Sequence, residues 1–164
     1  MSCFDRSTHR GASAIRALAL AAAMLWPMPS GAAASELHAL VIGIDEYRYG
    51  SSLRGAVNDA EDIAATLRRL GVRDLTVLLN GNATRDRIEA SWRAILRRAQ
   101  PGDKVLLSYA GHGSQEKENV PGSEEDGKDE GILLGGFNPV GPGTRERIID
   151  DEFNQWFQAA GERD

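Results

Sequence analysis

The chain has 164 residues, of which 41% are hydrophobic and 26% are charged, and this composition excludes a disordered or collagen-like protein. Its formal net charge of −5 makes it a poor candidate for binding nucleic acid or an anionic membrane surface. Cys3 is the single cysteine, so an intramolecular disulfide is excluded as well.

The first 34 residues have the pattern of a bacterial export signal. Arginines precede an apolar run at Ala17–Trp26 that is too short to span a bilayer, and Ala32–Ala34 offers a small-residue cleavage pattern. The sequence therefore predicts a signal peptide over residues 1–34, a domain over residues 35–164, and a location in the periplasm or outside the cell. Cleavage would remove Cys3, and no later stretch is long enough to cross a membrane. The alternative is an uncleaved tail or an N-terminal membrane anchor.

After the leader, strand and helix patterns alternate. Apolar runs predict strands at His38–Asp45, Asp74–Asn80 and Lys104–Ala110. Apolar positions at helical spacing predict a helix over Leu53–Leu70 and a second helix that begins after Thr84 as its N-cap. Strands joined by helices of this length pair in parallel, so the pattern predicts an open α/β sheet. Such sheets carry their chemistry in loops at the carboxyl ends of the strands.

The pattern changes beyond the third strand. Ser114–Glu130 is polar and rich in carboxylates, Ile132–Leu134 suggests a further short strand, and Gly135–Arg147 has the composition of a loop. A last helix is predicted over Ile148–Ala160. The side chains expected to face inward on it are Phe153, Trp156 and Phe157.

A histidine stands directly after the third predicted strand, between two glycines. Glycines on both sides allow a sharp turn and leave the imidazole of His112 open to a substrate. An imidazole there can take and return protons near neutral pH, which favours a catalytic role. The alternative is a loop histidine without a function. His38 opens the first strand and is interpreted as an ordinary edge residue.

The residues around this histidine resemble a known family. Tyr109–Gln115 (YAGHGSQ) resembles the Y-[SA]-G-H-G motif of the caspase and metacaspase cysteine peptidases. Four more segments resemble the family in the same order, and the acidic insert favours the metacaspase side. These segments are ALVIGI at 39–44, LRGAVNDA at 53–60, EDGKDE at 125–130 and IIDDEF at 148–153. The resemblance implies a caspase-like three-layer α/β/α sandwich with a mainly parallel sheet, and a protein or peptide as substrate.

The resemblance also implies roles for individual residues. His112 takes the place of the histidine that works with a cysteine nucleophile, and Gly113 would offer its backbone N–H to the oxyanion. Asp59 takes the place of an acid that selects Arg or Lys before the cut. The alternative for Asp59 is a surface carboxylate in the first turn of a helix, where the helix dipole favours it.

A calcium site is implied as well. Asp129, Asp150 and Asp151 fall where metacaspases bind an activating Ca²⁺, and clustered carboxylates supply the oxygen ligands that this ion requires. The alternative is a solvated acidic loop together with a helix N-cap. The chain departs from the family pattern at Leu134 and Gly136, where relatives carry Pro and Asp.

The family's nucleophile is missing from the mature part of the chain. In caspases the cysteine follows the histidine by about 50 residues, and this chain ends near that point. We therefore expect a domain that stops before the nucleophile strand, lacks activity alone, and leaves an unpaired sheet edge for self-association. The other hypothesis is a pseudo-peptidase or a calcium-responsive protein-binding module. A nucleotide-binding domain is disfavoured because no glycine-rich loop follows the first strand, and a zinc hydrolase because only two histidines survive processing.

Overall fold

The structure is a computed structural model, and it describes residues 35–118, 122 and 125–161. The predicted leader, with Cys3, lies outside the described residues, as do residues 119–121 and 123–124 of the acidic segment. The elements in chain order are β1 (Leu37–Gly43), α1 (Ala56–Arg69), β2 (Asp74–Leu79), η1 (Asn80–Asn82), α2 (Arg85–Arg98), β3 (Lys104–Ala110), β4 (Gly113–Lys117), β5 (Lys128–Leu133), η2 (Gly141–Arg145), β6 (Arg147–Ile149) and α3 (Asp150–Gly161).

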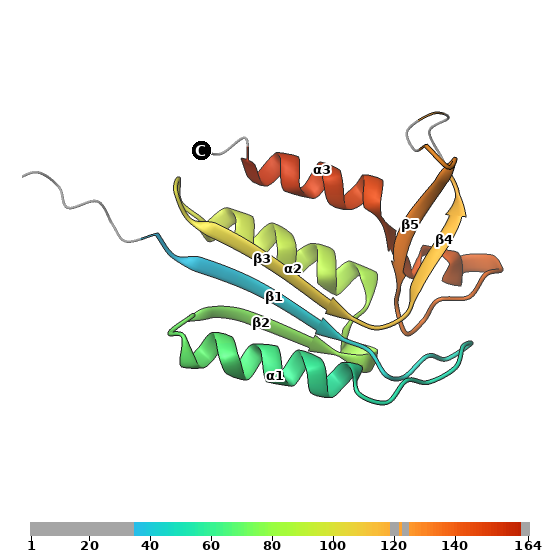
Figure 1. Cartoon of the computed structure of the whole chain (residues 1–164), viewed down its shortest axis with the longest axis horizontal. Coiled ribbons are helices and arrows are strands. Elements are labelled where there is room, and N and C mark those ends of the chain that lie inside the picture. Colours follow the sequence, from blue (N-terminus) through green and yellow to red (C-terminus); the bar gives the residue numbers. More distant parts are fainter. Residues whose placement is uncertain (1–34, 119–121, 123–124, 162–164) are drawn as a thin grey trace, which may run out of the picture. The chain divides into compact units, whose positions relative to one another are not determined.

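The three strands β2, β1 and β3 form a parallel sheet in that order (Figure 1). Leu40 of β1 lies opposite Thr76 of β2 and Leu107 of β3. β1 is the central strand, and its residues from His38 to Gly43 are all buried. The sequence pattern predicted this parallel sheet, and the prediction is confirmed. Among the described residues, β3 pairs along one side only.

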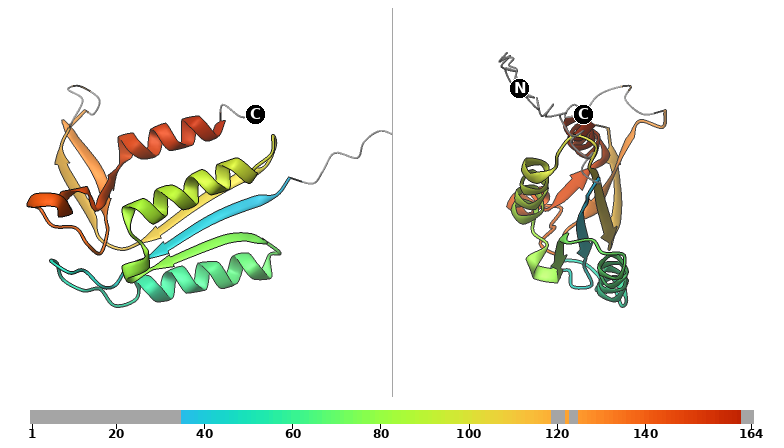
Figure 2. Two further views of the ribbon diagram at one scale, coloured as in Figure 1. Left: turned by 180° about the vertical axis from the view of Figure 1, so that it is seen from behind. Right: turned by 90° about the vertical axis from the view of Figure 1, so that its left-hand side faces the viewer.

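Helices cover both faces of the parallel sheet, because alternate side chains of β1 point to opposite faces. On one face, Ala39 and Val41 pack with Ala60 and Leu67 of α1. The other face carries α2 and α3, and α1 and α2 lie on opposite sides of the sheet (Figure 2). The core on that second face contains Leu40, Ile42, Ile88 and Ile95, with Phe153 and Trp156 of α3 packed against it. The implied three-layer α/β/α arrangement is confirmed.

A second, antiparallel sheet follows in the order β4-β5-β6. The sequence predicted one short strand at Ile132–Leu134, so β4 and β6 were missed and β5 begins earlier than expected. β4 has no apolar run because its residues, GSQEK, alternate between exposed and half-buried positions. β6 is only three residues long, and its last two residues were predicted as the start of the last helix, which begins at Asp150 instead of Ile148. Leu134, just after β5, is fully buried.

The helix boundaries show which local signals were reliable. Thr84 caps α2 as predicted, with its side-chain oxygen accepting a hydrogen bond from the Arg87 N–H. α1 begins at Ala56 rather than Leu53, because a carboxylate from the end of β1 caps it. Asp45 accepts from the N–H of Ala56 at 2.9 Å and from the N–H of the next residue at 3.4 Å.

The last helix packs less deeply than the sequence predicts. Phe157 is 43% exposed, so the expectation that it faces inward is wrong. Its ring nevertheless packs edge-on against Trp92 of α2 at a centroid distance of 5.1 Å, and Trp156 stacks on the same indole at 5.9 Å. Aromatic contacts with α2 therefore help to hold α3, beside the packing of Phe153 and Trp156 against the core. None of the helices in the described part of the chain has both the length and the apolar character needed to span a bilayer.

A buried histidine joins the three parallel strands at their amino ends. His38 is 4% exposed, and the Nδ1 of its imidazole lies 2.6 Å from Asp74 while its Nε2 lies 3.0 Å from Asp103. Both ring nitrogens face carboxylates, and only the protonated imidazolium can donate to both. Arg98 also pairs with Asp74, at 2.7 Å. His38 is thus an ionic clamp, not the ordinary edge residue that the sequence suggested.

The ion pairs around His38 shift the pKa values of the histidine and of its two carboxylate partners. Burial lowers the pKa of His38, but the hydrogen bonds that it donates to Asp103 and Asp74 outweigh burial and raise it above 6.5. The hydrogen bond from His38 lowers the pKa of Asp103 to about 2, and the hydrogen bond from Arg98 lowers that of Asp74. The carboxylates therefore contribute stability above pH 3.8 that is lost as the pH falls through their lowered pKa values.

On the alkaline side, we expect the free energy of unfolding to fall as the pH rises above 6.5 and through the raised pKa of His38. The reason is that the folded state binds the His38 proton more tightly than the unfolded state does, and this advantage is lost once the proton is released. Thermal unfolding of His38→Gln at a series of pH values should lack this decline. His112→Gln is the matched control, since it removes the other histidine of the described chain and should keep the decline. An unaltered decline in His38→Gln would contradict the prediction.

Candidate active site

The candidate site lies where the parallel sheet passes into the antiparallel one. The Ile44 N–H donates to the Ala110 carbonyl at 3.0 Å, which extends the pairing of β1 and β3 to their carboxyl ends. From there the chain runs through Gly111 and His112 directly into β4. The loop from β1 to α1 leaves the same edge of the sheet (Figure 1). His112 is therefore held between two sheets and beside a loop.

The imidazole of His112 has a defined orientation. Its Nε2 lies 2.8 Å from the main-chain carbonyl oxygen of Ser51. A carbonyl oxygen can only accept, so Nε2 carries the proton and Nδ1 keeps a lone pair in the neutral ring. The ring also packs against Tyr47, with 4.6 Å between centroids. The half-buried His112 thus presents Nδ1 as its basic nitrogen.

Two tyrosine hydroxyls surround the main chain of His112. The His112 N–H donates to the Tyr47 hydroxyl at 2.8 Å. The Tyr109 hydroxyl donates toward the carbonyl oxygens of His112, at 2.9 Å, and Leu133, at 2.6 Å. The two hydroxyls are 3.1 Å apart. Burial, followed by the hydrogen bond with Tyr47, raises the pKa of Tyr109, so this hydroxyl stays protonated and acts as a donor.

No side chain fits at Gly111. A Cβ built there would lie 2.5 Å from the Tyr47 hydroxyl oxygen and closer still to that of Tyr109. The glycine before His112 is therefore required by the close approach of the two hydroxyls, which adds a steric reason to the flexibility expected from the sequence.

The loop after β1 is anchored on three sides. The Asn80 side-chain oxygen accepts from the N–H of Asp45 at 2.8 Å, and Asn80 itself has a positive φ of 46°. The Arg48 N–H donates to the Gly135 carbonyl, and the Leu53 N–H closes the loop onto the Asp45 carbonyl, both at 2.8 Å. These contacts hold the loop that carries Tyr47 and Ser51.

The other predicted site residues lie on different elements. Gly113 is exposed and opens β4, and Asp59 is exposed in the first turn of α1. Asp129 is buried at 1% exposure on β5, while Asp150 and Asp151 open α3. Asp150 accepts from the N–H of Glu130 at 3.3 Å, so pairing of β5 with β6 brings the three predicted calcium ligands to adjoining strand and helix ends. The described residues nevertheless hold no group of three potential metal ligands arranged around one ion.

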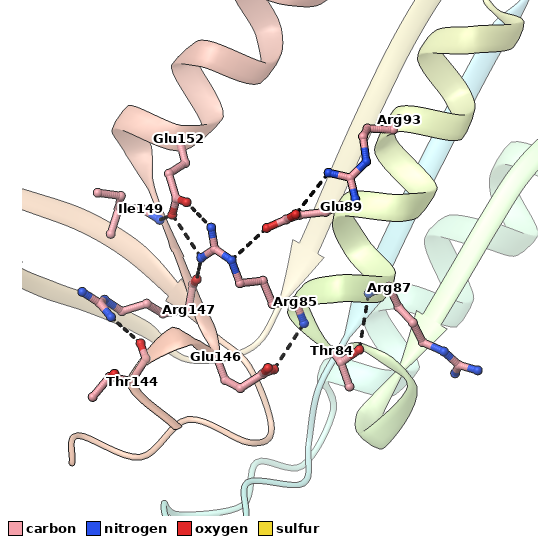
Figure 3. Close-up of polar contacts among 10 residues, drawn as sticks. All are labelled: Thr84, Arg85, Arg87, Glu89, Arg93, Thr144, Glu146, Arg147, Ile149 and Glu152. Carbon is pink, nitrogen blue, oxygen red and sulfur yellow. Dashed lines mark hydrogen bonds and ion pairs between the residues drawn. The ribbon is translucent and has the colours of Figure 1, made fainter. Parts of the chain in front are cut away.

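An arginine that the sequence analysis missed joins α2 to the start of α3. Arg85 contacts Glu152 and the Arg147 carbonyl, and its Nε pairs with Glu89 at 2.8 Å (Figure 3). The hydrogen bond with Glu152 raises the pKa of Arg85 further. A basic residue in the first turn of a helix is unfavourable because it opposes the helix dipole. The position of Arg85 in the sequence could therefore have indicated an acidic partner from another element.

A cavity of about 430 Å³ opens beside the same loop, on the side of Tyr47 and Asn80. Gly135, Gly136 and Glu146 line it as well, whereas His112 does not. At Gly136 a Cβ would come within 3.2 Å of the Glu146 side chain. The departure from the family pattern at Gly136 therefore lies at this cavity, while the departure at Leu134 lies in the core.

Fold and site together define an α/β domain with an ordered histidine at the sheet edge. The family model of the caspase domain matches residues 36–154. The chain is 34% identical over 125 residues to metacaspase-1 of Eremothecium gossypii. The match covers 71% of this chain and 26% of that protein. It is 34% identical over 124 residues to metacaspase-1 of Mycosarcoma maydis, covering 71% and 29%. The chain belongs to the caspase domain family and is a caspase- or metacaspase-like peptidase domain.

A solved structure supports the same fold. The crystal structure of a protein from Geobacter sulfurreducens matches this chain with a TM-score of 0.62 at 27% identity, over 76% of this chain and 45% of that one. The chain spans 26% and 29% of the two metacaspases, so each of these relatives is several times longer than the matched region.

We expect Gly111→Ala to destabilise the domain by about 1–3 kcal/mol, because overpacking against two buried hydroxyls forces the main chain to shift. Gly81→Ala is the matched control, since a Cβ at Gly81 has no neighbour within 4 Å and Gly81 is not among the glycines with positive φ. Denaturant unfolding of both variants measures the difference. Equal stability of the two variants would show that the contacts around Gly111 do not constrain the loop.

Proposed function

We propose that this domain supplies the general base of a cysteine endopeptidase, and that His112 is that base. The observation that carries the proposal is the hydrogen bond from Nε2 to the Ser51 carbonyl, which leaves the Nδ1 lone pair available to a thiol. Nδ1 takes the thiol proton, and the thiolate attacks the peptide carbonyl to form an acyl-enzyme. The imidazolium then returns the proton to the leaving amine.

The thiol itself is not among the described residues, since Cys3 is the single cysteine of the sequence. We therefore propose that this chain alone does not hydrolyse peptides. The same fact favours a second candidate function, a pseudo-peptidase or calcium-responsive module that binds proteins without cutting them. Both candidates need a peptide-binding surface beside His112.

The strand pairing supports an oxyanion role for Gly113. Opposite residues of an antiparallel pair alternate between those that exchange hydrogen bonds and those that do not. The Leu133 N–H donates to the His112 carbonyl at 2.9 Å, so Gly113, one residue on, falls in a pair that exchanges none. Its N–H thus points away from β5, and β4 is the outer strand of its sheet in the described structure. Such an N–H is available to a developing negative charge.

Asp59 is proposed to select Arg or Lys before the cut. α1 begins at the edge of the sheet that carries His112, and the Asp59 carboxylate is exposed in its first turn. Its charge complements a basic side chain and repels an acidic one. We further propose that the domain is exported and that the open side of β3 takes part in self-association, because an unpaired strand edge is a template for pairing.

We expect Asp59→Asn to weaken binding of an Arg- or Lys-containing peptide about tenfold, because a charge-assisted hydrogen bond is lost. Isothermal titration of the purified chain measures this affinity without needing turnover. Asp62→Asn is the matched control, since Asp62 is an exposed acid one turn further along α1.

Two outcomes would count against the proposed function. Equal affinity of parent and Asp59→Asn for the basic peptide would remove the specificity assignment. Hydrolysis by the purified chain that persists in His112→Ala would remove the assignment of the general base.

Calcium binding by Asp129, Asp150 and Asp151 stays a prediction. Three carboxylates are the right kind of ligand, but Ca²⁺ takes six to eight oxygens and the described residues do not form a complete cage. Both oxygens of Asp150 already accept backbone N–H groups, from Glu130 and Asp151.

We expect weak binding of Ca²⁺, with a Kd on the order of 10⁻⁴–10⁻³ M, because few ligands are present. The double variant Asp150→Asn, Asp151→Asn should lose the heat of binding in a calcium titration. Asp86→Asn, which removes an exposed acid in the first turn of α2, should keep it. Identical titrations of the double variant and the parent would contradict the assignment of these ligands.

A further inference from the structure

The hydroxyls beside His112 form a hydrogen-bond chain. Its direction follows from the single proton that each hydroxyl can donate. The Tyr109 hydroxyl has one proton, and its carbonyl partners, at Leu133 and His112, can only accept it. Toward Tyr47, at 3.1 Å, the Tyr109 oxygen must therefore accept. Tyr47 donates its own proton there, which leaves its oxygen to accept the His112 N–H at 2.8 Å.

The Tyr109 hydroxyl keeps its proton, which holds the direction of this chain. Tyr47 is 9% exposed, and the half-buried Tyr109 has a pKa raised by burial. The chain thus runs from the His112 N–H through Tyr47 and Tyr109 to the Leu133 carbonyl. It ties His112 to β3 and β5 through one residue of the loop after β1.

That same loop also holds the ring of His112. The Ser51 carbonyl accepts from Nε2, and the Tyr47 ring packs on the imidazole. The loop is itself fixed, since the Arg48 N–H donates to the Gly135 carbonyl. One anchored segment, Tyr47–Ser51, therefore orients both the main chain and the side chain of His112. Tyr47 contacts the main chain through its hydroxyl and the imidazole through its ring.

We propose that Tyr47 is a positioning residue for His112: its hydroxyl fixes the His112 main chain and thereby the Nε2–H tautomer that exposes Nδ1. This rests on the proposed function of His112. Tyr47 touches no substrate in this scheme and acts only through the histidine. Gly111 is part of the same arrangement, since its missing side chain is what lets both hydroxyls approach.

The test compares Tyr47→Phe with Tyr49→Phe in the same chain. Tyr47→Phe keeps the ring on the imidazole and removes only the hydroxyl. Tyr49 belongs to the same loop but is 53% exposed, with its ring beside the Arg48 guanidinium at 5.2 Å. Amide hydrogen exchange of His112 and the ¹⁵N shifts of its imidazole, both measured by NMR, report the main chain and the tautomer.

In Tyr47→Phe we expect the His112 amide to exchange about tenfold faster, because it loses its acceptor, and the fraction of Nε2–H tautomer to fall. Tyr49→Phe should match the parent in both readouts. A purely structural Tyr47 would lower the melting temperature and leave the tautomer unchanged, and that result would overturn the proposal.

A measurement on the unaltered chain keeps the proposal testable if Tyr47→Phe does not fold. The Tyr47 hydroxyl proton should exchange with water much more slowly than that of Tyr49 and should show a contact to the Tyr109 ring. Equal exchange of the two hydroxyls would overturn the proposal. These readouts need no substrate, so hydrolysis that persists in His112→Ala would remove the general-base assignment and leave the positioning of His112 by Tyr47 intact.

Discussion

The pairing of β1 with a neighbour on each side is the constraint on which the rest of the structure depends. β1 is buried along its length from His38 to Gly43, with α1 on one face and α2 and α3 on the other. His38 fixes its amino end to β2 and β3 through two carboxylates. At its carboxyl end, Asp45 caps α1 and the following loop carries Tyr47 and Ser51 to the histidine. One strand thus aligns the core, the first helix and the candidate site.

The antiparallel sheet adds to this framework and contributes Ile148 of β6 to the core. It is joined to the parallel sheet through the two residues Gly111 and His112, and to α2 through Arg85, whose partners Arg147 and Glu152 lie on β6 and α3. The candidate base, His112, therefore lies at the junction of the two sheets. The predicted calcium ligands lie next to the ion pairs that hold the antiparallel sheet.

Prediction from the sequence was reliable where the signal was local and apolar. The strand Lys104–Ala110 was predicted with its observed bounds, and Thr84 was recognised as an N-cap because a hydroxyl before a helical pattern has a direct local role. β4 could not be predicted, since GSQEK is polar and forms a strand only because Lys128–Leu133 pairs with it. Arg85 was missed for a related reason, because Glu152 is 67 residues away in the chain.

The sequence by itself determined the parallel α/β architecture, the family and the place of His112, because apolar periodicity and the YAGHG motif are properties of short segments. Only the tertiary structure decided which nitrogen of that histidine is basic. The residues that settle it, Ser51 and Tyr47, lie 61 and 65 positions before His112. Their approach depends on β1 and β3 lying side by side with the loop anchored beyond them, and such contacts between distant segments leave no pattern in either segment alone.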